Sequence, residues 1–200
     1  MKRTFKEALE HRRSHYMLGS ERLVGRKEIE EMVSFALLHV PSAFNSQSSR
    51  IVLLMGDAHR RLWQIVKDTL QTLLPAATFA RSEKKINACF AAGYGTLLFW
   101  EDAAVVERLQ RESPLYADSF PQWSQHTSAM HQLALWCMLE DAGLGASLQH
   151  YNPLIDNRVR EEWGLPVSWQ LVAQMPFGYP LSVPDVKGHE PLSDRMLVFE

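Results

Sequence analysis

Four short segments of this 200-residue chain combine charged or amide side chains with small residues. They are Arg12-Arg13-Ser14, Ser42 to Ser49, Gly143 to Asn152 and Pro176 to His189. Because they are far apart in sequence, only the tertiary fold could bring them to one site. If they converge, they would suit a large anionic ligand with an amide-rich ring, since guanidinium groups pair with phosphate and amides both donate and accept hydrogen bonds.

The segment Arg12-Arg13-Ser14 offers two guanidinium groups and a hydroxyl. A guanidinium fork binds phosphate oxygens at two points, and the serine hydroxyl adds a donor. The alternative is a solvated helix end, where cations also favour the helix dipole. His11 and His15 are four residues apart, but no carboxylate motif accompanies them, so no metal site is predicted.

The amide side chains of Asn45 and Gln47 lie in a polar loop between an expected helix and an expected strand. They match the alternating carbonyl and N–H groups of a flavin pyrimidine edge. Taken alone, the segment is better explained as a simple turn, because turns favour asparagine and serine. Lys187 and His189 follow two prolines near the C-terminus, and taken alone they read as solvated surface groups.

No sequence motif points to a catalytic side chain. The turn Gly143-Leu144-Gly145 follows a helix, so it lacks the strand-loop-helix context of a dinucleotide or phosphate loop. The chain has no G-x-S-x-G elbow and no evident Cys-His pair, so nucleophilic catalysis has no visible candidate.

Hydrophobic periodicity predicts the elements that must position these residues. Helices are expected at residues 3–13, 25–40, 57–74, 82–92, 101–112, 119–142 and 157–163. Strands are expected at residues 50–55, 94–100, 148–151, 168–175 and 196–199. This alternation predicts an α/β or α+β fold, a single domain spanning residues 1–200 with one mixed sheet enclosed by helices. The helix at 119–142 is apolar over much of its circumference, so it is either central to the domain or buried between subunits.

Composition restricts the partners and the compartment. Twenty-one Lys and Arg residues against 23 Asp and Glu residues give a net charge of −2, which argues against nucleic acid as the main partner. No apolar run approaches the ~20 residues that span a bilayer, so no membrane partner is expected. The charged start is not a secretory signal, and two distant cysteines fit a reducing, cytoplasmic setting.

Taken together and in order, the segments resemble the nitroreductase family. The early R-x-S, the P-S-x-x-N-x-Q loop, the small-residue turn, the late M-P-F-G-Y-P and the terminal K-x-R-x-P-L are matched at residues 12–14, 41–47, 143–145, 175–180 and 187–192. Further stretches at 12–18, 94–102 and 148–153 resemble a compact subgroup similar to the yeast fatty-acid-repression nitroreductases.

The resemblance implies a homodimer with FMN at the subunit interface, and a role for each matched residue. Arg12, Arg13 and Lys187 would hold the FMN phosphate, with Ser14 helping them or contacting the ribityl chain. Asn45 and Gln47 would address the isoalloxazine ring and the ribityl hydroxyls. Backbone groups near Gln149 and His150 would approach the flavin N5 and O4 atoms.

Two residues depart from the family pattern. His189 stands where many relatives have arginine, which would make the phosphate clamp weaker or pH-sensitive. Tyr16 stands where larger nitroreductases often have a lysine near the flavin O2 atom. Without that cation, negative charge on the reduced ring is less favourable, so we expect a lower reduction potential.

The resemblance further implies that NADH or NADPH reduces the flavin and that a small acceptor, such as a nitroaromatic or a quinone, reoxidises it in a ping-pong mechanism. Phe120 and Trp123, just before the long helix, are candidates for lining the substrate cleft, with the start of an amphipathic helix as the alternative. Two other functions remain open: a flavin-binding sensor with little turnover, and a structural dimer without a cofactor.

Overall fold

Antiparallel strands form the centre of the structure, a computed structural model that describes residues 3–200. The strands are β1 (Leu18–Gly19), β2 (Ser49–Met55), β3 (Gly95–Asp102), β4 (Gly145–Ala146) and β5 (Trp169–Pro180). Their order in the sheet is β1-β5-β3-β2, and β4 pairs with β5. Within residues 3–200 every ladder is antiparallel, and one isolated parallel bridge joins Ser14 to Ala146, so the sheet is mixed only there.

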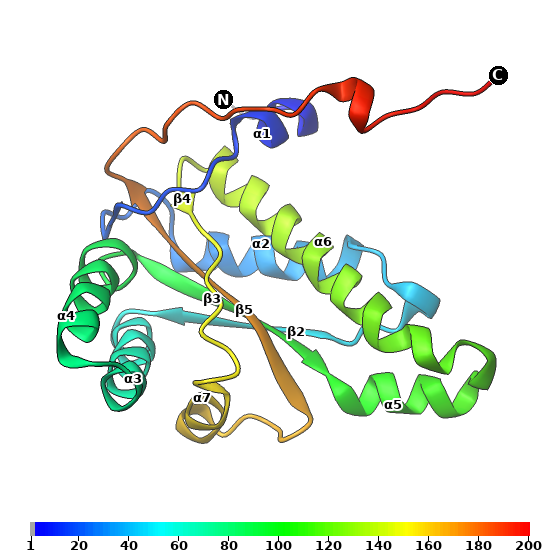
Figure 1. Cartoon of the computed structure of the whole chain (residues 1–200), viewed down its shortest axis with the longest axis horizontal. Helices are drawn as coiled ribbons and strands as arrows, with labels where there is room; N and C mark the ends of the chain where they lie inside the picture. The colour runs from blue at the N-terminus through cyan, green and yellow to red at the C-terminus, as the bar shows by residue number, and fades with distance from the viewer. Residues whose placement is uncertain (1–2) are drawn as a thin grey trace.

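Helices surround this sheet (Figure 1). They are α1 (Phe5–His11), α2 (Arg26–His39), α3 (Asp57–Leu73), α4 (Ala76–Lys85), α5 (Ala103–Glu112), α6 (Phe120–Asp141) and α7 (Asp156–Trp163). Short helical turns occur at η1 (Ala43–Asn45), η2 (Ile86–Phe90), η3 (Pro114–Ser119) and η4 (Leu192–Asp194). In residues 3–200, no helix combines the length and the apolar character needed to cross a membrane.

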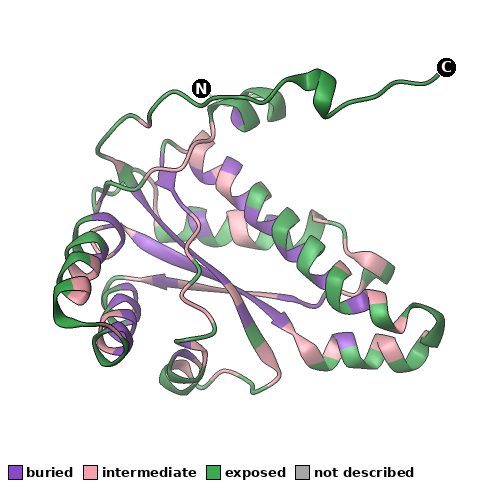
Figure 2. Cartoon of the chain, in the orientation of Figure 1, coloured by how far each residue is buried: buried purple, intermediate pink, exposed green. Residues whose placement is uncertain are grey.

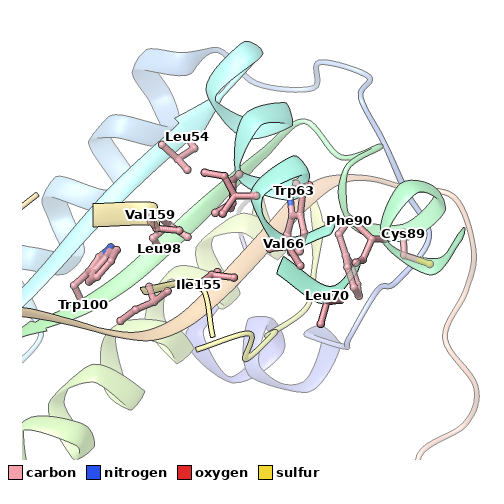
Figure 3. Close-up of a cluster of buried hydrophobic side chains, with 14 residues drawn as sticks. Leu54, Trp63, Val66, Leu70, Cys89, Phe90, Leu98, Trp100, Ile155 and Val159 are labelled. Atoms are coloured by element: carbon pink, nitrogen blue, oxygen red, sulfur yellow. The ribbon is translucent and has the colours of Figure 1, made fainter. Parts of the chain in front are cut away.

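The strand β3 shows how the sequence builds two cores. Successive side chains of a strand point to opposite faces of its sheet. Leu98 and Trp100 therefore join one buried cluster, which also contains residues of α3 and α7 (Figure 3), whereas Leu97 and Phe99 join a second cluster with residues of α2 and α6. Every residue of β3 except the last is buried (Figure 2), as expected for a strand covered by helices on both faces.

The predicted fold class is confirmed, and most elements lie where periodicity placed them. The long helix at 119–142 is α6, with Ser119 and Ala142 as its flanking residues. The helix expected at 82–92 begins earlier, at Ala76 behind Pro75, and continues as a π-helical turn to Phe90. The helix expected from residue 101 begins at Ala103, because Glu101 and Asp102 extend β3 and Asp102 caps α5.

Two predicted strands are wrong. Residues 148–151 contribute only an isolated bridge between Gln149 and Gln174. The pairing ends there because the next inward-facing N–H group, that of Tyr151, donates to the Gln174 side chain at 2.7 Å and not to a strand backbone. Residues 196–199 form no strand within the described chain; their side chains are 62–88% exposed on the C-terminal tail. An apolar run predicts burial, but residues 196–199 do not pack against their own subunit.

Candidate functional site

A cleft of about 650 Å³ lies between the segment that follows α1 and the segment that follows β5. Its walls are residues 12–17 on one side and residues 182–187 on the other. Three cationic side chains line it, those of Arg12, Arg13 and Lys187, together with Ser14. We call this site the cationic cleft; the structure brings these four predicted phosphate ligands together from opposite ends of the chain.

Backbone pairing fixes the N-terminal wall of the cationic cleft. The helix α1 ends at His11, and the backbone N–H of Arg12 still donates to the Ala8 carbonyl at 2.9 Å. Three residues later the chain joins the sheet, because the His15 N–H donates to the Ala146 carbonyl at 2.9 Å. Gly145 permits this approach, since a Cβ atom there would lie 2.7 Å from the His15 Cβ.

The opposite wall is the first part of the C-terminal tail. The Arg13 guanidinium donates to the Asp185 carbonyl, and the His15 ring nitrogen Nδ1 lies 3.3 Å from the Ser182 carbonyl. These contacts hold residues 182–187 across from residues 12–17. His189 lies two residues beyond Lys187, is exposed, and does not line the cleft.

The predicted amide residues Asn45 and Gln47 lie outside the cationic cleft. They belong to the amide loop, residues 41–48, which includes η1 and packs beside α6. Figure 1 shows α1 beside one end of α6 and η1 nearer its other end, so the loop and the cleft are separated within one subunit. Both amide side chains are exposed.

The amide loop has a strained backbone. Phe44, Asn45 and Gln47 all have positive φ, at 56°, 50° and 48°. This left-handed conformation is unfavourable for residues other than glycine and persists only where surrounding contacts hold it. One such contact is the 3.1 Å hydrogen bond from the Gln47 backbone N–H to the Ser42 hydroxyl. Strain of this kind concentrates at functional sites.

A buried carboxylate anchors the end of the amide loop. Glu101 is 2% exposed, and it accepts hydrogen bonds from the hydroxyls of Ser48 and Ser49. Burial raises the pKa of Glu101, against the opposing effects of the two serine donors and of Arg50. The Arg50 guanidinium also donates to the Gln47 carbonyl at 2.8 Å and pairs with Asp102 at 3.0 Å. The loop is therefore tied to the ends of β2 and β3.

An aromatic cluster packs against the amide loop. The Phe44 ring lies 5.2 Å from that of Phe120 and 6.0 Å from that of Trp123, measured between centroids, and it is nearly parallel to the latter. Phe120 is buried and Trp123 is half-buried, so helix packing accounts for the first. The substrate role expected for both residues stays a prediction.

Gln149 and His150 do not line the cationic cleft either. Gln149 exchanges backbone hydrogen bonds with Gln174 of β5, at 2.7 Å and 2.9 Å, and its side chain donates to the Ser147 hydroxyl. The His150 side chain is exposed. Their backbone approach to a flavin ring stays a prediction.

Sequence reasoning missed two residues next to the cleft. The Trp136 ring of α6 lies below the Arg12 guanidinium, and the Lys85 amine lies 5.6 Å from the ring centroid of Tyr16. Trp136 reads as one more apolar residue of an apolar helix, and Lys85 reads as a solvated helix end. Only the tertiary packing of α1 on α6, and of the segment after α1 near α4, could reveal them.

The comparisons with known proteins agree with this architecture. Residues 9–179 match the model of the nitroreductase family. The chain is 35% identical over 182 residues to nitroreductase FRM2 of Saccharomyces cerevisiae, with 90% of each chain covered. The structure of nitroreductase CinD from Lactococcus lactis in complex with chloramphenicol matches with a TM-score of 0.90 and 40% identity, over 98% of this chain and 100% of that one.

CinD has also been solved with nicotinic acid and with 4-nitrophenol. A nitroreductase structure from Saccharomyces cerevisiae matches with a TM-score of 0.76 and 32% identity, over 92% of this chain and 98% of that one. The family and these relatives support an oxidoreductase function. The resemblance of the motifs to the yeast subgroup is thereby confirmed, and the chain belongs to the nitroreductase family.

Proposed function

We propose that the chain is an FMN-dependent oxidoreductase that passes electrons from NADH or NADPH to a small acceptor. The observation that carries this proposal is the convergence of Arg12, Arg13 and Lys187 on one cleft. A phosphate monoester carries a charge of about −1.5 to −2 near neutral pH, which these cations complement. The dianionic end of FMN is therefore the part of the cofactor that the cleft fits best.

The remaining chemistry of the cleft also fits FMN. Its volume of about 650 Å³ lies within the range of roughly 300–1,000 Å³ typical of cofactor sites. Arg12 and Arg13 would bind phosphate oxygens through their forks, Lys187 would add a point charge, and the Ser14 hydroxyl would donate a further hydrogen bond. When bound, FMN would supply the redox chemistry that links the nicotinamide donor to the acceptor.

A second copy of the chain would complete the site. Asn45 and Gln47 do not line the cationic cleft of their own subunit, so their amides would address the flavin of the partner. Exposed apolar side chains favour such a dimer, because large apolar patches mark interfaces. On α2, Phe35 is 57% exposed and Leu38 is 78% exposed, and the tail adds the apolar residues 196–199.

Small nitroaromatic compounds are the acceptor class that the relatives favour. CinD binds 4-nitrophenol, and its complex with nicotinic acid contains a relative of the nicotinamide ring. In this chain Trp123 is half-buried beside the amide loop, so it could stack on a flat acceptor brought to that loop. A quinone would offer the same flat, electron-poor ring.

An absorption spectrum of the purified full-length protein is the first test. We expect flavin bands, and NADH or NADPH oxidation that depends on 4-nitrophenol or a quinone with ping-pong kinetics. A colourless protein that does not bind added FMN would contradict the proposal and favour a structural dimer. Flavin bands without measurable turnover would instead favour a flavin-binding sensor.

A further inference from the structure

A side chain outside the cationic cleft holds one of its cations. The Cζ atom of Arg12 lies 4.5 Å from the centroid of the Trp136 ring, so the guanidinium covers the indole face. Trp136 belongs to α6 and does not line the cleft. Arg12 is half-buried and lines the cleft, so the same side chain contacts the indole and borders the space where an anion would bind.

Both partners of this contact are fixed from behind. Trp136 packs against the buried cluster formed by α2, α6 and the sheet, so its ring has a defined position. Arg12 directly follows the C-terminal end of α1. The N-terminal end of α1 is held against the last turn of α6. There the Arg3 backbone N–H donates to the Asp141 carboxylate at 2.7 Å, and the Arg3 guanidinium pairs with Glu140 at 3.3 Å.

The indole is the main electrostatic partner that the structure gives to Arg12. Within residues 3–200, the Nε atom of Arg12 is buried without a hydrogen-bond partner, and no carboxylate lies within ion-pair distance of the guanidinium. A guanidinium stacked on an aromatic face keeps the N–H groups of its edge free. Stacking thus orients Arg12 without neutralising it.

We infer that Trp136 is a positioning residue for phosphate recognition, acting through the face of its indole on the Arg12 guanidinium. This inference rests on the proposed function, since it concerns how the chain holds the phosphate of FMN. A cation–π contact is worth about 0.5–2 kcal/mol, the upper part of this range applying to partly buried sites such as this one. Loss of the contact should therefore weaken phosphate-dependent binding about 5- to 30-fold.

The test compares FMN with riboflavin, which has the same ring and ribityl chain but no phosphate. The full-length protein is stripped of flavin, and the dissociation constants of both ligands are measured by fluorescence titration. We expect Trp136→Leu to weaken FMN binding about 5- to 30-fold and to leave riboflavin binding within about twofold. Trp136→Phe, which keeps a weaker aromatic face, should give an intermediate loss.

A double-mutant cycle and a matched control separate positioning from general damage. In an Arg12→Gln background, Trp136→Leu should no longer change FMN affinity, because the two residues act through one contact. Trp163→Leu removes an indole of similar burial from the opposite core and should leave both affinities unchanged. If Trp136→Leu does not fold, Trp136→Met takes its place, with far-UV circular dichroism as the check.

The outcomes distinguish this inference from the proposed function. If the wild-type chain binds neither FMN nor riboflavin, the proposed function fails. If the wild type binds FMN and Trp136→Leu binds it equally well, only the inference fails. Equal weakening of FMN and riboflavin would also overturn it, because that result shows a structural role rather than phosphate positioning.

Discussion

The Ser48 hydroxyl donates a hydrogen bond of 2.6 Å to the Glu101 carboxylate, which is buried at the end of β3. Ser49 donates to the other carboxylate oxygen. These two bonds connect the strained amide loop to the centre of the sheet. The conformation of Asn45 and Gln47 therefore depends on a carboxylate that is buried within their own subunit.

We expect Glu101→Ala to lower the free energy of unfolding by about 2–3 kcal/mol, because two buried hydroxyls lose their acceptor. Urea unfolding would measure this loss, and FMN retention should fall with it. Glu107→Ala, at an exposed position of α5, is the matched control and should stay within about 0.5 kcal/mol of the wild type. Similar unfolding curves for the two variants would refute the anchoring role.

The stability of the protein should fall as the pH falls from about 6.5 to about 4. His59 is buried, with Nδ1 2.9 Å from the Thr96 hydroxyl, and burial lowers its pKa from 6.5 to about 4. Below pH 6.5 the unfolded chain binds a proton that the folded chain excludes, so this contribution is present above pH 6.5 and is lost toward pH 4. The full loss is roughly 3 kcal/mol.

Urea unfolding at a series of pH values, with wild type and His59→Gln compared at each, would isolate this contribution. The difference between the two proteins cancels the titration of other groups, including Glu101. We expect that difference to shrink as the pH falls. A difference that stays constant between pH 7.5 and pH 4.5 would show that His59 does not titrate as its burial indicates.

Lys187 should contribute to FMN binding through the phosphate alone. Lys187→Met should raise the dissociation constant of FMN about 5- to 30-fold, for a lost charge-assisted contact of about 1–2 kcal/mol. Riboflavin binding should not change. Lys6→Met, which removes the same charge from the exposed face of α1, should leave both affinities unchanged, and an equal effect of the two variants would point to a non-specific charge effect.

Complementation between variants can test whether the amide loop serves the partner subunit. Asn45→Gly removes the amide but tolerates the φ of 50° at this position. If each site combines one subunit's Lys187 with the other's Asn45, unfolding and refolding an equal mixture of Lys187→Met and Asn45→Gly should restore about a quarter of the sites to wild-type FMN affinity. Should both residues serve the same subunit, no mixture would restore any.

A lysine at position 16 should raise the reduction potential of the bound flavin. Tyr16 lines the cationic cleft, and the family resemblance implies that it stands where larger nitroreductases often have a lysine. A cation near the ring favours the negative charge of the reduced flavin, so Tyr16→Lys should raise the two-electron midpoint by about 30 mV, equivalent to ~1.4 kcal/mol. Spectroelectrochemical titration would measure it, with Tyr16→Phe as the control, and an unchanged or lower midpoint for the lysine variant would contradict the expectation.

Periodicity predicted the regular elements well and the ends of the chain poorly. The helix α6 was predictable because Ser119 and Gly143 mark both of its ends. The apolar residues 196–199 gave the same signal as a buried strand, yet they lie exposed on the tail. Sequence patterns report which residues avoid water, but they do not report whether the covering surface belongs to the same subunit.

The cationic residues of the candidate site were predictable from the sequence, but the separation of the amide residues from them was not. Arg12, Arg13 and Lys187, which the family resemblance implies as phosphate ligands, do line one cleft, and their binding of phosphate stays a prediction. Asn45 does not join them within one subunit. This could not be predicted, because the spacing of segments along the chain does not show which of them meet in the fold. Trp136 was not predictable for a similar reason, because its role depends on the packing of the Arg12 side chain against its ring.

The helix α6 sets the separation between the amide loop and the Arg12 side chain. Trp123 beside the amide loop and Trp136 beneath Arg12 are 13 residues apart, since 136 − 123 = 13, on one uninterrupted helix. At about 1.5 Å and 100° per residue, a single inserted residue between them would shift one tryptophan and turn it by more than a quarter of a circle relative to the other. The helix thus fixes both the distance and the angle between these two indoles. An insertion between them should abolish flavin binding, whereas an insertion of the same size in the tail or in a surface loop should be tolerated.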